Sequence, residues 1–373
     1  MSGNPAGSMS DEGFAGAERR PGQPLLSVTI PTYNRARYLG ELLETLLPQF
    51  AGVSTDVAEL VISDNASEDN TAEVIAGFQA RGLPCRYVRN EVNRGSDANF
   101  LQCLSLARGQ YAWVLGDDDL LMPHAIASLL SLLAEGEYDM VYLSSFGFGG
   151  GAGQENFSGR QTRKDKLGRF AEVVTDGEYF LEKVNALIGL ISVMLVNKNL
   201  LQATPHPPIE QLCNTNLMQL GWLLPLVHRR MRVLYVWERL VAYRQFNSGG
   251  WGICEVFGVR LEKIAHRYFE REPQLARSLM NGVLRYWMFD SIIQMRHGLH
   301  TTMNCENFAA DMRHIFARNW RYWVFVYPVA QWRLPAADAW YRMFAAINKL
   351  TRAVQAVWRH VFRHGRYLQP QSR

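Results

Sequence analysis

The chain has 373 residues, of which 48% are hydrophobic and 12% aromatic, and its formal net charge is +4. This composition allows one large domain or two smaller ones with a sizeable core, and it excludes an intrinsically disordered protein. The five cysteines show no paired spacing, which favours reduced thiols in a cytosolic protein over disulfides or a zinc site. No run of about 18 uncharged apolar residues is present, so a membrane-spanning helix is not expected.

The first 145 residues predict alternating strands and helices. Residues 1–24 are rich in Gly, Ser, Pro and charge, which predicts a disordered leader. Short apolar, β-rich runs predict strands at residues 26–32, 58–63, 85–89, 111–115 and 139–144. Helical spacing of apolar residues predicts helices at residues 37–47, 71–81, 96–107 and 123–134. Alternation at this spacing indicates right-handed βαβ units, and therefore an α/β fold with a mostly parallel sheet.

Polar clusters follow the strands of this predicted sheet. They occupy residues 32–35, 64–70, 93–99 and 116–119. Because ligands of such sheets bind beyond the carboxyl ends of the strands, the four clusters are expected to meet in one crevice.

The most distinctive cluster is "LGDDDLLMP", which places Asp117, Asp118 and Asp119 directly after an apolar run. Carboxylate oxygens are the ligands that hard divalent cations prefer, and such a cation can bridge carboxylates to a nucleotide diphosphate. The alternative is structural, with Asp119 as the N-cap of the next helix and its neighbours solvated.

The other clusters offer groups suited to a nucleotide. Asp64 ends a central strand, where a carboxylate can accept a hydrogen bond from a base. "TIPTYNR" can form a nucleoside shelf with Arg35 near phosphate, and "NRGSDAN" provides a Gly-permitted turn at a helix start. Each of these motifs by itself is also common in turns and on surfaces.

The second part of the chain is less regular. Residues 147–168 are Gly-rich and predict a mobile loop. Helices are predicted at residues 175–184 and 210–227, and strands at 189–196 and 233–244. A flexible loop is expected at 245–252, followed by helices with many Trp, Tyr and Arg residues.

Taken together, "SVTIPTYNRARYLGELLETL", "LVISDNASEDNT" and "NEVNRGSDANFLQCLSLARGQYAWVLGDDDLLMP" strongly resemble family 2 glycosyltransferases with the GT-A fold, over roughly residues 25–145. "SDNAS" and "LGDDD" are similar to the abequosyltransferase-type branch, which takes part in bacterial O-antigen and related polysaccharide assembly. The resemblance implies a GT-A domain over residues 25–250, with a nucleotide-sugar half (25–145) and an acceptor half (146–250). A helical, basic and aromatic C-terminal region follows at 251–373.

The resemblance also implies roles for particular residues. The metal, Mn²⁺ or Mg²⁺, would be held by Asp118 and Asp119. Asp119 is also expected to be a catalytic residue. Many relatives have Asp-x-Asp-Asp at this motif, and here Gly116 replaces the first Asp. The residues expected to bind the donor, a nucleotide-diphosphate sugar, are Pro31, Thr32, Tyr33, Arg35, Asp64, Asn93, Gly95, Asp97, Asn99, Asp117, Asp118 and Arg244.

The catalytic base has a weaker signal. Inverting members use a carboxylate, often in a Glu-Asp pair at a helix start, to take the proton of the acceptor hydroxyl. No such pair stands at the expected place, and Glu210 is the nearest carboxylate, with His206 as a rival. The structural alternative for Glu210 is a first-turn residue favoured by the helix dipole.

"YRQFNSGGW" resembles the C-terminal active-site loop of the family, which often provides a His. This segment has no His. The candidates are Arg244, Gln245, Asn247 and Ser248, and Arg244 suits a phosphate. The Gly pair would let the loop close as a lid.

The end of the chain is strongly basic. From Arg313 onward there are eleven Lys or Arg residues and one acidic residue, Asp338. A helix over 340–364 would carry a basic side opposite an apolar stripe, which is typical of an interfacial membrane anchor. The predicted stripe consists of Trp340, Phe344, Ile347, Val354, Trp358 and Val361, and the basic side of Arg342, Lys349, Arg352, Arg359 and Arg363. The alternatives are packing on the catalytic domain or on a second copy in a homodimer. Nucleic acid is disfavoured, because no nucleic-acid motif accompanies the charge.

Together with the resemblance, these patterns predict a metal-dependent glycosyltransferase that extends a lipid-linked or oligosaccharide acceptor of a bacterial surface glycan. Inversion is what the resemblance implies. The enzyme would be cytoplasmic and peripheral on the inner face of the inner membrane, held there by anionic lipid. One alternative is a catalytically degenerate GT-A scaffold in a polysaccharide assembly complex. The other is a sugar nucleotidyltransferase, which is disfavoured because "PTYNRARY" lacks a Gly-rich loop.

Overall fold

The computed structural model describes residues 18–149, 170–229, 231–245, 252–299, 308–362 and 367–368. Several predictions therefore lie outside the described residues: most of the 1–24 leader, most of the 147–168 loop, Asn247, Ser248 and the Gly pair of the predicted lid, and Arg363. Residues 18–24, which the prediction included in the leader, are described and hydrogen-bonded. Gln23 Nε2 donates to Asn199 Oδ1 at 3.0 Å, and Arg19 Nη2 donates to the Asp56 carbonyl at 2.7 Å.

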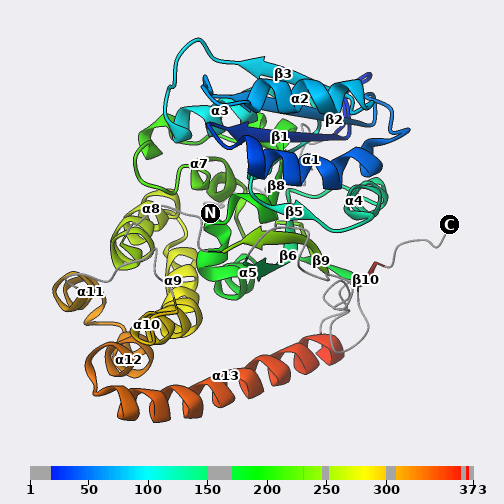
Figure 1. Ribbon diagram of the computed structural model, residues 1–373. Coiled ribbons are helices and arrows are strands. Elements are labelled where there is room, and N and C mark those ends of the chain that lie inside the picture. The colour runs from blue at the N-terminus through cyan, green and yellow to red at the C-terminus, as the bar shows by residue number, and fades with distance from the viewer. Residues whose placement is uncertain are drawn as a thin grey trace, which may run out of the picture.

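The N-terminal half forms the parallel part of one sheet (Figure 1). Strands β1 (Leu26–Thr32), β2 (Ala58–Asp64), β3 (Cys85–Arg89) and β4 (Tyr111–Val114) lie in the order β4-β1-β2-β3, and each pair is parallel. The connecting helices are α1 (Ala36–Phe50), α2 (Thr71–Ala80), α3 (Ser96–Leu106) and α4 (Ala125–Ala134). The predicted α/β class and its strand–helix alternation are confirmed.

Two layers of helices cover this sheet. Apolar residues of α1, α2 and α4 share a buried core with alternate residues of β1, such as Val28 and Ile30. Helix α3 lies on the opposite face, where Cys103 and Leu104 pack with residues of β4. Because side chains of a strand alternate between faces, this arrangement buries β1 completely.

The second half of the chain extends the same sheet and makes it mixed. The full order is β10-β7-β9-β6-β8-β4-β1-β2-β3, and β5 pairs with β9 outside this path. β8 runs antiparallel to β4 and β6, and β9 runs parallel to β6. The additional strands are β5 (Leu120–Leu121), β6 (Met140–Phe148), β7 (Ala171–Val174), β8 (Met194–Asn197), β9 (Val233–Arg244) and β10 (Tyr367–Leu368).

Two predicted elements of this half are wrong. The strand expected over 189–196 is reduced to β8, since two 3₁₀ turns, Asn185–Gly189 and Ile191–Val193, come first. The helix expected over 210–227 is broken into 3₁₀ turns at Ile209–Leu212 and Leu224–Leu226 and one α-helical turn, α7 (Leu220–Leu223). Asn214 and Asn216 adopt positive φ angles of 63° and 61°, which a continuous α-helix does not allow.

The C-terminal region is helical, as predicted, but it shares its core with the sheet. Side chains such as Phe257, Leu284 and Val326 belong to the same buried cluster as residues of β4 and β8. The helices of this region are α8 (Leu261–Tyr268), α9 (Pro273–Gly282), α10 (Phe289–Arg296), α11 (Phe308–Phe316), α12 (Tyr327–Gln331) and α13 (Leu334–Phe362), and α5 (Gly177–Val184) and α6 (Lys198–Ala203) come before it in the chain. Among the residues that the structure describes in this region, three π-helical segments accompany them, at Cys254–Arg260, Val283–Met288 and Tyr322–Val326.

Helix α13 is long and lies at the end of the molecule remote from β1–β3 (Figure 1). The predicted apolar stripe is wrong for its first two residues. Trp340 and Phe344 face the protein, where the Phe344 ring centroid lies 5.5 Å from that of Phe325. Burying two aromatic rings against an aromatic neighbour removes more apolar area from water than packing the smaller residues would.

The outward face of α13 instead carries aliphatic residues. Ile347 and Val354 are 45% and 58% exposed, and Met343 and Leu350 lie beside them at 47% and 66%. The spacing 343, 347, 350, 354 places the four side chains on one side of the helix. The side chains of Trp358 and Val361 lie outside the described set. None of the helices in the described ranges is both long and apolar enough to cross a bilayer.

A buried carboxylate, Glu59, joins three elements of the parallel half. Its side chain accepts hydrogen bonds from Ser27 Oγ at 2.6 Å and from the Arg108 backbone N–H at 2.7 Å. Arg108 Nε also donates to Glu59 Oε2 at 2.8 Å. Burial alone would raise the pKa of Glu59, but these hydrogen bonds and the Arg108 charge outweigh burial and lower the pKa.

We expect a Glu59→Gln variant to lose about 1–3 kcal/mol of unfolding free energy at pH 7. Because the folded-state pKa is lowered, this stability is present above the ordinary pKa of about 4.3 and is lost as the pH falls through the folded pKa. Urea unfolding of wild type and variant should therefore converge in acid. Glu44→Gln, at an exposed ion pair with Arg81, is the control and should cost less than about 1 kcal/mol. A Glu59 effect that is independent of pH would contradict this account.

Candidate active site

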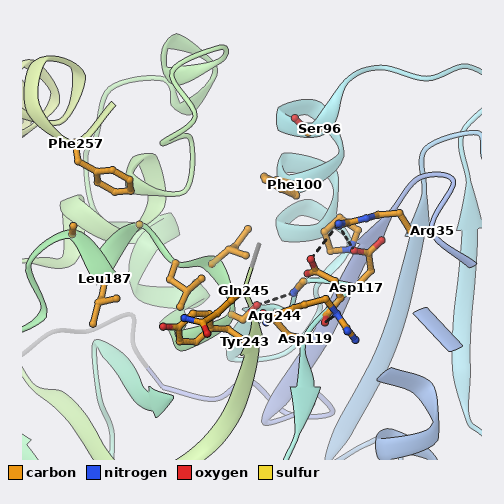
Figure 2. A pocket seen from close by; sticks show the side chains of 18 of the residues that line it. Arg35, Ser96, Phe100, Asp117, Asp119, Leu187, Tyr243, Arg244, Gln245 and Phe257 are labelled. Carbon is orange, nitrogen blue, oxygen red and sulfur yellow. Dashed lines mark hydrogen bonds and ion pairs between the residues drawn. The ribbon is translucent and has the colours of Figure 1, made fainter. Parts of the chain in front are cut away.

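The strand ends open into a cavity of about 820 Å³. Its lining includes residues at the ends of β1 and β4, the start of α3, the end of β9, the 3₁₀ turns before β8, and the C-terminal helices. Figure 2 shows Arg35, Asp117 and Asp119 on one side of this cavity and Phe257 on the other. The predicted convergence of polar clusters on one crevice is thus confirmed for all four clusters, although the cluster at 64–70 contributes Asn65 and not the expected Asp64.

The three aspartates lie side by side between β4 and β5, and two of them bind residues at the end of β1 or just after it. Thr32 Oγ1 donates to Asp117 Oδ2 at 2.8 Å, and Arg35 Nη1 donates to Asp117 Oδ1 at 2.9 Å. Arg35 Nη2 lies 3.2 Å from Asp118 Oδ2. Both oxygens of Asp117 are therefore engaged by the protein, whereas Asp118 is partly exposed to the cavity.

Asp119 is held from the opposite side, by β9. The Arg244 backbone N–H donates to Asp119 Oδ1 at 2.9 Å, and Ser192 is a further hydrogen-bond partner. The Arg244 side chain is 5% exposed and its guanidinium is paired with Glu41 of α1. The structure thus shows Arg244 holding the aspartate cluster in place, and a phosphate contact by Arg244 stays a prediction.

The cluster carries more negative charge than its surroundings compensate. Burial raises the pKa of Asp117 to about 6, although Arg35 opposes this effect. Burial and the neighbouring charge of Asp118 raise the pKa of Asp119 to about 7. Carboxylates in this state would gain from a nearby cation.

Gly116 accounts for the close spacing of these groups. A Cβ atom at residue 116 would lie 3.2 Å from Ser192 Oγ and 3.3 Å from oxygens of Asp118 and Asp119. The Gly116 backbone N–H also donates to Ser192 Oγ at 2.9 Å. A side chain here, such as the Asp found in related motifs, would crowd the two aspartates. The alternative role of Asp119 as a helix N-cap is wrong, because α4 begins at Ala125 with His124 as its N-cap.

A network of asparagines forms the wall beside the aspartates. Asn65 Nδ2 donates to Asn93 Oδ1 at 2.7 Å and to the Gly95 carbonyl at 3.1 Å. Gly95 has a φ of +85° at the start of α3, a conformation that strongly favours glycine. Asn99 is buried and donates to the Ser63 carbonyl at 3.0 Å. Pro31 and Tyr33 complete this side, and the Tyr33 ring is 37% exposed.

Three predicted residues do not line the cavity. Asp64 is fully buried, and its oxygens accept hydrogen bonds from the Ser67 backbone N–H at 2.8 Å and Tyr87 Oη at 2.6 Å. Asp97 points away and accepts a hydrogen bond from the Asn214 backbone N–H at 2.6 Å. Glu210 is exposed on a 3₁₀ turn and is not among the lining residues. Its rival His206 does not line the cavity either. The proposed catalytic and donor-binding roles of these residues stay predictions.

Sequence reasoning missed several lining residues. Asn65 lies inside the quoted motif "SDNAS", next to the Asp64 that was chosen, so its signal was available. Further missed residues come from regions without a recognisable motif. They are Asn185 and Ser192 before β8, and Phe257, Tyr286, Trp287, Asp290, Ser291, Gln294 and Arg352 from the helical region.

The donor set suits a hard cation, with one condition. The side-chain oxygens of Asp118 and Asp119 are of the type that Mg²⁺ and Mn²⁺ prefer. Within the described ranges, however, no group of three or more His, Cys, Asp or Glu side chains is arranged to hold a metal by itself. A cation at this site would therefore need further ligands from a bound phosphate or from water, as Mg²⁺ commonly does.

The mixed sheet, the helices on both faces and the aspartates after β4 define a GT-A-like α/β protein. The structure matches S. aureus TarS 1–349 with a TM-score of 0.53 and 16% identity, covering 87% of this chain and 91% of that one. The structure of the same TarS fragment in complex with UDP-GlcNAc matches with a TM-score of 0.51 and 15% identity, covering 87% of this chain and 92% of that one. These likenesses support the fold.

Residues 27–187 match the profile of glycosyl transferase family 2, so the chain carries a domain of this family and the predicted resemblance is confirmed. Abequosyltransferase RfbV of Salmonella typhimurium is 46% identical over 110 residues, which are 29% of this chain and 32% of RfbV. A Campylobacter jejuni GalNAc(5)-diNAcBac-PP-undecaprenol beta-1,3-glucosyltransferase is 30% identical over 143 residues, 38% of this chain and 45% of that protein. The chain thus spans about a third to a half of the length of these relatives.

Proposed function

We propose that this protein is a glycosyltransferase that moves a sugar from a nucleotide-diphosphate donor to a growing bacterial surface glycan, such as O-antigen. One observation carries this proposal. A family 2 glycosyltransferase domain places three aspartates, with raised pKa values for two of them, at the strand-end cavity where α/β sheets bind ligands. The similarity to an abequosyltransferase supports a polysaccharide product.

The donor would lie between the aspartates and the asparagine wall. Tyr33 offers a partly exposed aromatic face for a nucleobase, and Asn65 and Asn93 surround the turn at Gly95. Arg35 is already paired with Asp117 and Asp118, so it acts first as the group that orients the aspartates. In this arrangement the protein binds the nucleoside with one wall and presents the carboxylates toward the diphosphate.

A divalent cation, Mn²⁺ or Mg²⁺, fits the proposal at Asp118 and Asp119, with the donor diphosphate completing its ligands. When bound, such a cation would neutralise the charge that develops on the departing nucleoside diphosphate. Asp117 would not be a ligand, because Thr32 and Arg35 already engage both of its oxygens.

The acceptor hydroxyl needs a proton acceptor, and inversion is what the family resemblance implies. Glu210 would have to move to reach the cavity, since its side chain is not part of the lining. Among the described lining residues, Asp290 is the one carboxylate outside the aspartate cluster, and burial raises its pKa. Both carboxylates remain candidates within this proposal.

A lipid-linked acceptor and a peripheral position on the inner face of the cytoplasmic membrane complete the proposal. The C. jejuni relative is named for an undecaprenol-diphosphate-linked glycan, which supports this acceptor class. The aliphatic side of α13, with Arg342 and Lys349 on an adjoining exposed side, suits an anionic membrane surface. The alternative is that a second copy of the chain covers the same face of α13 in a homodimer.

Thermal unfolding with a panel of nucleotides and nucleotide sugars, with and without Mn²⁺, tests the donor site. We expect one nucleoside diphosphate or its sugar to raise the Tm in a metal-dependent way, because a ligand that binds only the folded state stabilises it by mass action. At a concentration of 100 times Kd the gain is about 2.7 kcal/mol. The shift should disappear in an Asp118→Asn variant. No shift with any nucleotide would favour a degenerate GT-A scaffold instead.

A further inference from the structure

The cavity has a second wall, opposite the aspartates, that is built from the helical region. Phe257 comes from the segment Cys254–Arg260, Tyr286 and Trp287 from Val283–Met288, and Asp290 from α10. Figure 2 shows Phe257 facing the cavity from the side opposite Asp117 and Asp119. This wall lies outside residues 27–187, the part of the chain that matches the family profile.

The backbone that carries this wall is unusual. Cys254–Arg260 and Val283–Met288 are both π-helical, a conformation that is rare and is frequent at functional sites. Each π-helical segment places at least one aromatic residue on the cavity, and the Phe257 and Trp287 ring centroids are 4.3 Å apart. Two independent backbone irregularities therefore contribute to one aromatic surface.

A glycine on the facing turn leaves room for this surface. A Cβ atom at Gly189 would lie 3.2 Å from Phe257 Cε1, which is closer than nearly all real Cβ contacts. Gly189 itself lines the cavity. Any larger residue there would push the Phe257 ring and reshape the wall.

Charged and polar groups surround the aromatic rings. Arg352 of α13 places its guanidinium carbon 3.8 Å from the Tyr286 ring centroid. Asp290 accepts a hydrogen bond from Tyr341 Oη at 3.2 Å, and Ser291 and Gln294 lie on the same helix face. The wall thus combines flat apolar surfaces with hydrogen-bonding side chains at its edge.

This combination matches a saccharide ring. A pyranose presents C–H groups on its face, which pack on aromatic rings, and hydroxyl groups on its edge, which bind carboxylates, amides and guanidinium groups. A cavity of about 820 Å³ is near the upper end of the usual range for small-molecule sites, roughly 300–1,000 Å³, which leaves room beside a nucleotide.

We propose that Phe257, Tyr286 and Trp287, together with Asp290 and Arg352, form a binding subsite for the non-reducing end of the acceptor glycan. The inference rests on the proposed function, because the sugar on this wall would be the one that receives the donor's sugar across the cavity. It assigns the helical region a role in choosing the acceptor.

Saturation-transfer NMR on the full chain, with UDP and Mn²⁺ present, tests this subsite. The probes are di- and trisaccharides built from glucose, galactose, mannose and rhamnose. We expect at least one to bind wild type, and Trp287→Ala to weaken it at least about tenfold. Trp287→Phe should retain part of the affinity. Trp320→Ala, at a 56% exposed Trp outside the cavity lining, is the matched control and should bind as wild type does.

Arg352→Ala guards against a folding artefact. The Arg352 side chain is exposed and its one described ring contact is with Tyr286, so its loss should lower the Tm only slightly while weakening saccharide binding. Absence of saccharide binding to wild type would overturn the inference. So would a Trp287→Ala variant that loses nucleotide and keeps saccharide, because the wall would then belong to the donor. Saccharide binding without transfer from any donor would instead contradict the proposed function and leave the subsite standing.

Discussion

An Asp118→Asn/Asp119→Asn variant is expected to lose sugar transfer by at least about a thousandfold while keeping its fold. The two carboxylates are the cavity's candidate cation ligands, and removing both charges would leave the departing diphosphate without compensation. The effect is measured as the rates of sugar transfer and of donor hydrolysis in the presence of Mn²⁺. Both rates are obtained from the release of the nucleoside diphosphate.

The same variant separates catalysis from stability. Because the pKa of Asp119 is raised to about 7, its charged form is unfavourable in the folded state and costs stability at neutral pH. A neutral side chain of similar shape should therefore leave the Tm equal or higher, as is common when functional groups are removed. Asp56→Asn, at an exposed residue outside the cavity, is the control for charge and should be fully active. An active double variant would overturn the assignment.

A Leu350→Glu/Val354→Glu variant is expected to bind anionic lipid vesicles roughly thirtyfold more weakly than wild type. Leu350 and Val354 are 66% and 58% exposed, and their transfer into the interface is worth about 2 kcal/mol together at partial insertion. The two added carboxylates also repel anionic lipid. Sedimentation with phosphatidylglycerol vesicles at low and moderate salt measures the change.

Val92→Glu is the matched control, since Val92 is 66% exposed but lies next to α3, at the other end of the molecule from α13. Its vesicle binding should equal that of wild type. If the wild-type protein does not bind vesicles and forms a dimer, whereas the α13 variant is a monomer, the aliphatic face is a contact between two copies. Light scattering on the same samples distinguishes that outcome.

The local pattern of the sequence was sufficient for the parallel half. Strand β3 has the predicted bounds, Cys85–Arg89, and α3 and β4 each differ from the prediction by one residue at one end. Helical and strand periodicities are properties of neighbouring residues, and buried parallel strands give continuous apolar runs that are easy to recognise. Because the carboxyl ends of parallel strands share an edge, the prediction also brought Thr32, Asn93 and Asp117–Asp119 to one cavity.

The irregular half depended on backbone conformations that apolar spacing does not reveal. The positive φ angles of Asn214 and Asn216 interrupt a segment whose apolar residues would otherwise suit a helix. Likewise, the π-helical segments that carry Phe257 and Trp287 have no sequence signal of their own, because their shape is set by packing within the shared core.

The sequence by itself determined the fold class, the family domain and the aspartates at its strand ends, since these follow from local periodicity and contiguous motifs. Only the tertiary structure decided which polar groups face the cavity. The Asp64 carboxylate accepts hydrogen bonds from Ser67 and Tyr87, and the Arg244 guanidinium is paired with Glu41. The tertiary structure also decided which side of α13 faces outward. It placed helices that are distant in the sequence at the second wall of the site. Those outcomes depend on contacts between residues far apart in the chain, where competing burial and pairing decide each side chain's position.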